Sequence, residues 1–229
     1  MKNIGVIMPY IDNNENFVKK FIKRHKCEVF PVTEYGFNFI VVYDNQNCSK
    51  LLNKHGVNSI VVLTDAELEY CDFGILDGDS MFKRMLPEFV RKTAKGFGVN
   101  CSVTLVDKNM SDYGMSFAEK LCDICNYVFI YTQNISRAEL LCERLLDKYG
   151  VVVNIIKDKS PINTNLAVVI EGCGNRYGEN CVVIDKNLKK GNNRVINDFY
   201  IPFRIKPPFG MSNLVFAECT EVIKVVDIH

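Results

Sequence analysis

The sequence lacks an excess of charge of either sign. Its 28 basic and 27 acidic side chains leave a formal net charge of +1. Proteins that bind nucleic acid usually carry a basic excess or a basic stripe along one face. The charge balance therefore argues against a polyanionic partner, and we expect no nucleic acid to bind.

Long apolar runs are also missing. The longest, such as FIVVY and LAVVI, have the length of a strand, whereas a helix needs roughly 20 apolar residues to cross a bilayer. The amino-terminal stretch MKNIGVIMPYIDNN is interrupted by Pro9 and Asp12 and has no small-residue cleavage site, so we do not interpret it as a signal peptide. We expect a cytoplasmic protein with no membrane partner.

Familiar catalytic arrangements are absent as well, since no Ser-His-Asp, Cys-His or HExxH pattern is found. Ten cysteines are many for 229 residues, and without an export signal we expect reduced thiols that serve as small core residues. Cys122 and Cys125 have the spacing of a redox or zinc motif, to which Cys173 and Cys181 could add two ligands. Core thiols are the favoured interpretation.

The chain alternates strand-length apolar runs with helical periodicity, which predicts an α/β fold. We expect a small α/β domain over residues 1–96 and a Rossmann-like domain with a mostly parallel sheet over residues 97–229. The boundary is predicted near Gly96–Gly98. A last helix, Asn213–Val222, is expected to pack back on the first domain.

The most informative segment, from Cys101 to Asn134, has the strand–helix–strand pattern that opens a dinucleotide-binding fold. Its turn, DKNMSDYGMS, contains one glycine, Gly114, where a phosphate-binding turn has three. A helix N-terminus attracts anions even without glycines, but Asp107 and Asp112 would repel phosphate. Capping boxes are predicted at Ser116 and at Ser136, each followed three residues later by glutamate.

Residues 127–156 carry a family resemblance. The stretch Thr132-Gln133-Asn134-Ile135-Ser136-Arg137-Ala138 resembles the N-R-T-x-x-R-A motif of the NADP-binding domain in shikimate-dehydrogenase-like proteins, and the Arg-Ala pair matches outright. The arginine that would hold a 2′-phosphate is Gln133 here, and no acidic residue ends the strand to hold a ribose diol. The resemblance implies the fold of the carboxyl-terminal half, while the first domain lacks the family's catalytic motifs. The whole chain is also similar to two-domain Rossmann-like proteins of clostridia, for which there is no mechanism to transfer.

Loops that follow the strands of a Rossmann sheet line its ligand crevice. This rule selects three segments of the chain as the candidate ligand site. The candidate residues are Tyr113, Gly114, Ser116, Thr132, Gln133, Asn134, Arg137, Gly172 and Gly174. Catalytic residues and the cofactor are left unassigned, with NAD or NADP as the cofactor that the fold suggests.

Three functions are compatible with these features. The first is a non-catalytic or ligand-binding protein with a degenerate dinucleotide site, the second an NAD(P)-dependent oxidoreductase. The third is a magnesium-dependent nucleotide-sugar transferase that uses Asp77 and Asp79, because hard cations prefer carboxylate oxygens. A turn at Gly78 with a helix cap is the simpler interpretation of those two residues. A small-molecule ligand and a homodimer are the partners left open.

Overall fold

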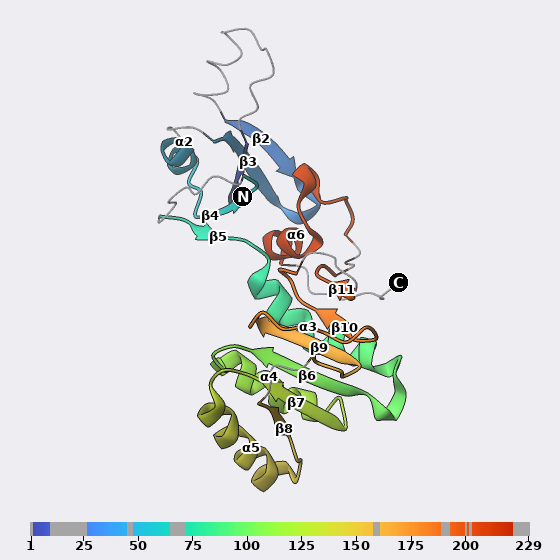
Figure 1. Ribbon diagram of the computed structural model, residues 1–229. Coiled ribbons are helices and arrows are strands. Elements are labelled where there is room, and N and C mark those ends of the chain that lie inside the picture. The colour runs from blue at the N-terminus through green and yellow to red at the C-terminus, as the bar shows by residue number, and fades with distance from the viewer. Residues whose placement is uncertain are drawn as a thin grey trace. The chain divides into compact units, whose positions relative to one another are not determined.

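The computed structural model describes residues 2–9, 27–44, 48–64, 72–157, 161–188, 193–199, 201 and 203–221. Contacts between residues divide the chain into two compact units (Figure 1). The first comprises Met1–Met81 with Ile201–Lys224, and the second Phe82–Tyr200 with Val225–His229. The helix predicted at Glu15–Arg24 lies outside the described residues.

The first unit is built on a five-stranded sheet with the order β2-β3-β1-β4-β5. All neighbouring pairs are parallel except β2 and β3, which are antiparallel. The elements are β1 (Lys2–Met8), β2 (Glu28–Val32), η1 (Thr33–Tyr35), β3 (Phe37–Tyr43), α2 (Cys48–Lys54), β4 (Ser59–Val62), β5 (Gly74–Ile75), η3 (Pro208–Gly210) and α6 (Asn213–Thr220). The central strands are continuous apolar runs because both faces of this sheet are covered.

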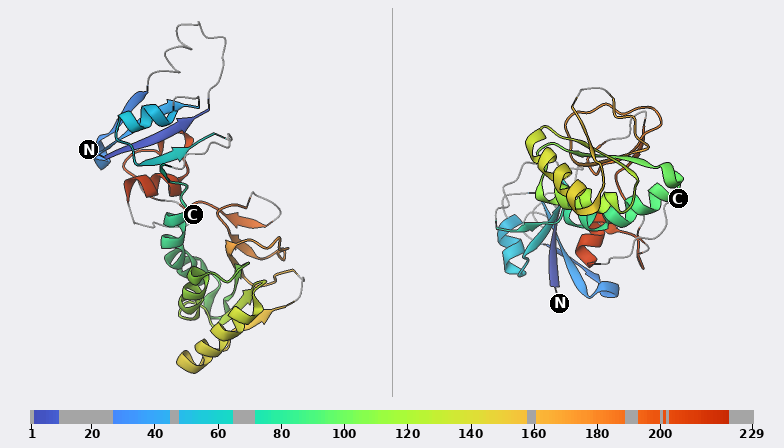
Figure 2. Two further views of the ribbon diagram at one scale, coloured as in Figure 1. Left: turned by 90° about the vertical axis from the view of Figure 1, so that its left-hand side faces the viewer. Right: turned by 90° about the horizontal axis from the view of Figure 1, so that it is seen from below.

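Helices α2 and α6 lie on opposite faces of this sheet (Figure 2). On one face Ile7, Ile40 and Val42 pack with Leu52 of α2. On the other, Ile4 and Phe39 pack with Phe216 of α6, which comes from the far end of the chain. The period of two along each strand separates these two apolar sets. Residues from the carboxyl-terminal segment therefore complete the core of the amino-terminal unit.

The second unit contains a six-stranded, fully parallel sheet with the order β11-β10-β9-β6-β7-β8. Numbered within the unit, this is the 3-2-1-4-5-6 order of the Rossmann fold. The elements are α3 (Asp79–Lys95, which begins in the first unit), η2 (Gly98–Asn100), β6 (Ser102–Asp107), α4 (Asp112–Cys122), β7 (Tyr127–Tyr131), α5 (Ile135–Tyr149), β8 (Asn154–Ile156), β9 (Leu166–Glu171), β10 (Val182–Ile184) and β11 (Arg194–Ile196). The expected Rossmann-like α/β fold is confirmed.

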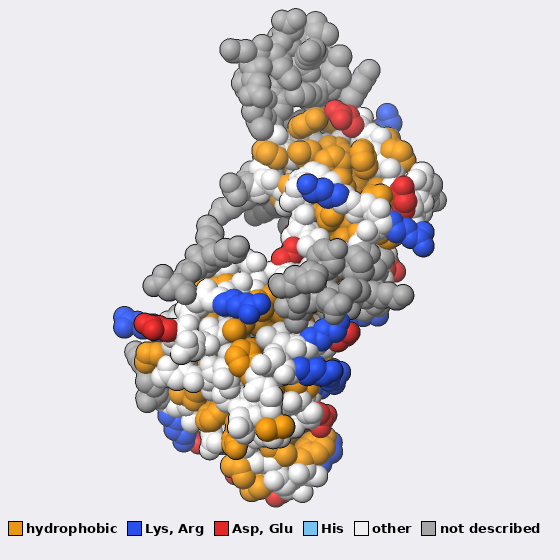
Figure 3. Space-filling view, turned by 90° about the vertical axis from the view of Figure 1, so that its right-hand side faces the viewer, with side chains coloured by type: hydrophobic (Ala, Val, Ile, Leu, Met, Phe, Trp, Pro, Cys, Tyr) orange, Lys and Arg blue, Asp and Glu red, His pale blue; other side chains and the backbone are white. Residues whose placement is uncertain are grey.

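Helices cover one face of this sheet, where α4 and α5 lie side by side against β6, β7 and β8. Right-handed crossovers place both helices on the same face. The other face is covered by the loops around Ile162 and Tyr177, which form an isolated parallel bridge. Over the face drawn in Figure 3, apolar, basic and acidic side chains of the described residues are interspersed.

The division between the units falls between Met81 and Phe82, within α3, and not near Gly96–Gly98 as the glycines suggest. The reason is packing, since Phe82 and Phe89 of α3 stack on Phe199, with ring centroids 5.3 and 4.1 Å apart. Most of the helix thus belongs to the Rossmann core. Among the described residues, no helix has both the length and the apolar character to cross a membrane.

Both predicted capping boxes are wrong. Helix α4 begins at Asp112 with Ser111 as its N-cap, and α5 begins at Ile135 with Asn134 as its N-cap. The serines at 116 and 136 therefore lie inside helices whose first turns the periodicity did not include. The predicted stop of α5 at Gly150 is confirmed, with this glycine in the left-handed conformation at φ 66°.

Candidate ligand crevice

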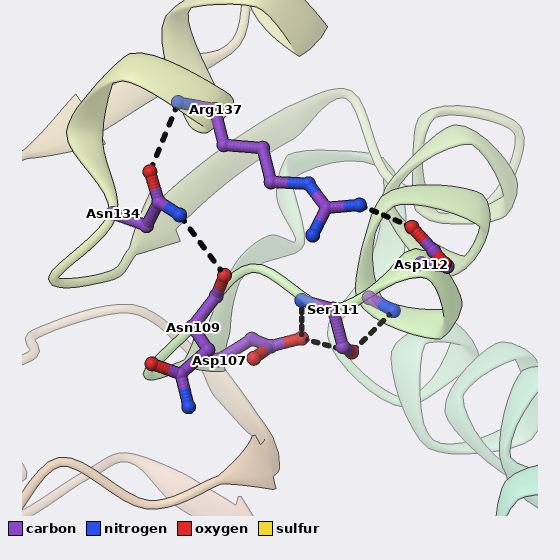
Figure 4. Close-up of polar contacts among 7 residues, drawn as sticks. Asp107, Asn109, Ser111, Asp112, Asn134 and Arg137 are labelled. Atoms are coloured by element: carbon purple, nitrogen blue, oxygen red, sulfur yellow. Dashed lines mark hydrogen bonds and ion pairs between the residues drawn. The ribbon is translucent and has the colours of Figure 1, made fainter.

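The candidate site lies at the carboxyl edge of the Rossmann sheet, between β6 and β9. Strand order reverses there, because β7 lies on one side of β6 and β9 on the other. Ligands of open α/β sheets bind in the crevice outside such a switch point. The turn from β6 into α4, residues 107–112, lies at this position (Figure 4).

Asp107 ends β6 and turns its side chain under the start of α4. Its Oδ2 accepts hydrogen bonds from the Ser111 amide at 2.9 Å and from the Ser111 hydroxyl at 2.6 Å. The Ser111 hydroxyl oxygen accepts in turn from the Gly114 amide at 3.0 Å. The helix N-terminus, which in a nucleotide-binding protein faces a phosphate, here faces a carboxylate of the same chain.

Asp107 is fully buried. Its second oxygen, Oδ1, has no hydrogen-bond partner within the part of the chain that the structure describes. A buried carboxylate is costly unless it is compensated, and hydrogen bonds from Ser111 together with the α4 dipole supply that compensation. The carboxylate is thus a fixed negative charge at the place where an incoming anion would have to bind.

Because Gly114 has no side chain, the Asp107 carboxylate has room at the start of α4. A Cβ built on Gly114 would lie 2.0 Å from the Asp107 Oδ2 and 3.0 Å from its Cγ. The single glycine of the turn therefore leaves room for the protein's own carboxylate. In a dinucleotide-binding turn, a glycine in this region lets the backbone approach a pyrophosphate.

Hydrogen bonds join the turn to the ends of both neighbouring strands. The Lys108 carbonyl accepts from the Gln133 amide and the Thr132 hydroxyl, each at 3.0 Å. The Lys108 amide donates to the Glu171 carbonyl at 3.1 Å, and the Asn109 side-chain amide donates to the Glu171 carboxylate at 2.8 and 3.1 Å. The turn is therefore held on two sides before any ligand binds.

The side chain of Arg137, in α5, extends to the start of α4. Its guanidinium forms an ion pair with Asp112, the first residue of α4, and its backbone amide donates to Asn134 Oδ1 at 3.3 Å (Figure 4). The Asn134 side chain also donates to the Asn109 carbonyl at 3.4 Å. The ion pair is exposed, so its contribution to stability is about 0–1 kcal/mol. The arginine that the motif resemblance selected is therefore paired with a carboxylate of the same protein.

The loop after β9 reaches the same edge of the sheet. Gly172 and Gly174 flank Cys173, and the pKa of the Cys173 thiol is raised by burial and then by the charges of Glu171 and Asp107. A raised pKa keeps this thiol protonated and weakly nucleophilic near neutral pH. The loop thus places a weakly nucleophilic thiol and two glycines beside the turn at residues 107–112.

The structure brings most of the predicted site residues together, but not all. Gly114, Thr132, Gln133, Asn134 and Arg137 surround the turn. Tyr113 instead donates its hydroxyl to the Lys83 carbonyl of α3 at 2.5 Å and stacks on Phe117. Ser116 is exposed one turn further along α4.

Asp107, Ser111, Asn109 and Glu171 were not among the predicted site residues. The sequence signal for Asp107 and Ser111 is the order D-x-x-x-S-x-x-G, which begins at the last residue of a buried strand. An aspartate placed there can cap the helix that follows only if a nearby glycine leaves space for its side chain.

The other candidate sites have simpler explanations. Asp77 Oδ1 accepts from the Asp79 amide at 2.8 Å, and the Gly78 amide donates to Glu218 Oε2 of α6 at 2.7 Å. A Cβ on Gly78 would lie 2.9 Å from that of Leu214, so the glycine permits close packing. No group of three or more His, Cys, Asp or Glu residues that could hold a metal occurs among the described residues.

No family model matches the sequence, and no curated protein matches it either. Solved structures that it resembles include a shikimate 5-dehydrogenase-like protein, at 12% identity over 81% of this chain and 77% of that one, with a TM-score of 0.31. A quinate dehydrogenase from Corynebacterium glutamicum, solved with NAD, matches at 12% identity over 81% and 79%, with a TM-score of 0.34. A ligand-free 5-ketofructose reductase of Gluconobacter matches at 10% identity over 85% and 82%, with a TM-score of 0.36. At these scores, the fold assignment rests on the strand order itself.

Proposed function

We propose that this chain is a Rossmann-fold binding protein whose crevice takes a small polar ligand without a pyrophosphate, and that it does not transfer hydride. The observation that carries the proposal is the Asp107 carboxylate, which is buried at the N-terminus of α4 and accepts two hydrogen bonds from Ser111. A pyrophosphate bound there would meet a negative charge in a desolvated place, where like charges repel strongly.

The groups around the crevice support a polar ligand. Gln133, Asn134, Asn109 and Glu171 are exposed at this edge of the sheet. A polar ligand would therefore meet amide and carboxylate groups, of which Asn109 and Glu171 hydrogen-bond each other. The position of the arginine that would hold a 2′-phosphate is occupied by Gln133, and Arg137 of the matching Arg-Ala pair forms an ion pair with Asp112. These contacts favour a neutral or weakly cationic compound over a dinucleotide.

A thermal-shift screen tests the proposal. We expect NAD⁺, NADH, NADP⁺ and NADPH at millimolar concentration to leave the melting temperature of the wild-type protein unchanged, because a ligand that does not bind the native state cannot stabilise it. Adenosine and nicotinamide riboside serve as dinucleotide fragments without a pyrophosphate. Saturable stabilisation by any of the four dinucleotides would overturn the proposal in favour of an NAD(P)-dependent oxidoreductase.

The internal carboxylate can be tested by chemical rescue. In Asp107→Ala the Ser111 amide and the α4 dipole lose their anion, so formate or phosphate should raise the melting temperature of this variant well above the rise seen in the wild type. Chloride at the same ionic strength controls for screening. Asp112→Ala removes the exposed carboxylate of the same turn. Formate or phosphate should raise the melting temperature of this variant no more than that of the wild type. Equal responses of Asp107→Ala and the wild type would mean that the carboxylate does not occupy an anion site.

A further inference from the structure

A pair of thiols lies at the opposite edge of the Rossmann sheet from the crevice. The Cys125 thiol donates a hydrogen bond to the Cys101 sulfur, with the two sulfurs 3.9 Å apart. Both residues are almost completely buried, with 2% of Cys101 and 4% of Cys125 exposed. The sequence motif pairs Cys125 with Cys122, but the structure pairs it with a cysteine 24 positions earlier.

The sheet fixes this pairing. Ser102 and Tyr127 are register partners in the parallel β6–β7 ladder, which places Cys101, one position before Ser102, and Cys125, two positions before Tyr127, at the same edge of the sheet. The Asn126 side chain donates to the Val99 carbonyl at 2.9 Å, which ties the loop before β7 to the segment before β6. Neighbouring strands are about 4.8 Å apart, a separation within the range of Cα distances that a disulfide spans.

A cavity lies against the two cysteine residues. It has a volume of about 340 Å³, and its lining includes Cys101, Cys125, Lys95 and Val99. Val99 is 79% exposed, so the lining reaches the protein surface. The share of liquid volume of one water molecule is about 30 Å³, which leaves ample room for a small oxidant.

We propose that Cys101 and Cys125 form a dithiol site that hydrogen peroxide and small organic hydroperoxides oxidise to an intramolecular disulfide. This site is separate from the proposed ligand crevice and does not depend on it. The hydrogen bond from Cys125 lowers the pKa of the Cys101 thiol and raises that of Cys125. Cys101 is accordingly the nucleophile of the pair, because the thiolate is the reactive form.

The oxidation of the two thiols to a disulfide takes place in two steps. The Cys101 thiolate attacks the peroxide, the O–O bond breaks, and Cys101 becomes a sulfenic acid while the other oxygen leaves as water or an alcohol. The Cys125 sulfur then attacks the Cys101 sulfur, and the hydroxide that leaves takes up the Cys125 proton as water. The two thiols supply two electrons to the peroxide. Bond formation shortens the sulfur separation from 3.9 Å to about 2.05 Å.

Peptide mapping after peroxide treatment tests the site. We expect a peptide that joins Cys101 to Cys125, lighter by two hydrogens than the two reduced peptides. The disulfide closes a loop that contains β6 and all of α4, so the melting temperature should rise by roughly 5–10 °C. Cys122→Ser should retain both the cross-link and this rise, whereas Cys125→Ser should lose both.

Several results would overturn the proposal. One is a disulfide between Cys122 and Cys125 in the wild type, and another is full alkylation of both Cys101 and Cys125 after peroxide treatment. Conversion of Cys101 to sulfinic acid without a cross-link would also count against it. If Cys125→Ser does not fold, the wild-type and Cys122→Ser maps still decide the question, because each reports the cross-link directly.

Discussion

Gly114→Ala is expected to destabilise the Rossmann unit by about 3 kcal/mol, although alanine normally favours a helix over glycine. The added Cβ would lie 2.0 Å from the buried Asp107 carboxylate. Either the carboxylate moves and gives up its hydrogen bonds to Ser111, or the first turn of α4 is displaced. Urea denaturation followed by circular dichroism measures the loss.

Asp107 determines whether Gly114→Ala destabilises or stabilises the protein. In an Asp107→Ala background the clash is gone, so Gly114→Ala should stabilise the protein by about 0.5–1 kcal/mol. In an Asp107→Asn background the side-chain atoms remain, so the destabilisation should persist, which separates crowding from charge. Ser116→Ala, on the exposed side of α4, should change stability by less than about 0.5 kcal/mol. Additive effects of Gly114→Ala and Asp107→Ala would show that the two residues do not contact each other.

Phe216→Ala is expected to cost the first unit about 3–5 kcal/mol. This ring is fully buried, and it packs against Phe203 at 4.8 Å and Tyr35 at 5.7 Å between ring centroids. Hydrogen exchange followed by mass spectrometry localises the effect, and protection in β1 and β3 should fall by at least a hundredfold.

Two controls accompany this measurement. Val29→Ala, at a side chain that is 54% exposed in β2 of the same unit, should change protection little. Amides of β6 report on the second unit and should keep their protection in Phe216→Ala. An equal loss of protection in β1 and β6 would contradict the division of the chain into two units.

The Rossmann fold was predictable because its signals are local. Val103, Thr104, Leu105 and Val106 form an uninterrupted buried run, as a strand covered on both faces requires. The stop of α5 at Gly150 was equally local, since glycine adopts the left-handed conformation without strain. The predicted helix starts are wrong because the first turns after Ser111 and Asn134 mix polar and apolar residues and carry little periodicity.

The anionic character of the site was partly visible in the sequence. Asp107 and Asp112 flank the turn, and their charge alone argues against phosphate. The sequence could not reveal that one of them turns inward to Ser111 while the other pairs with Arg137 on the next helix. That choice depends on where α4 and α5 lie relative to β6, a relation between residues far apart in the chain.

By itself, the sequence determined the α/β class, the parallel strands of the Rossmann unit and the lack of a dinucleotide motif, because these follow from periodicity, turn residues and charge. Tertiary structure alone decided that the Asp107 carboxylate fills the helix N-terminus, that Phe216 is the side chain of the last helix that packs against Phe203 and Tyr35, and that Cys125 lies against Cys101. Each of these contacts joins side chains through space, and strand order and packing decide which side chains meet.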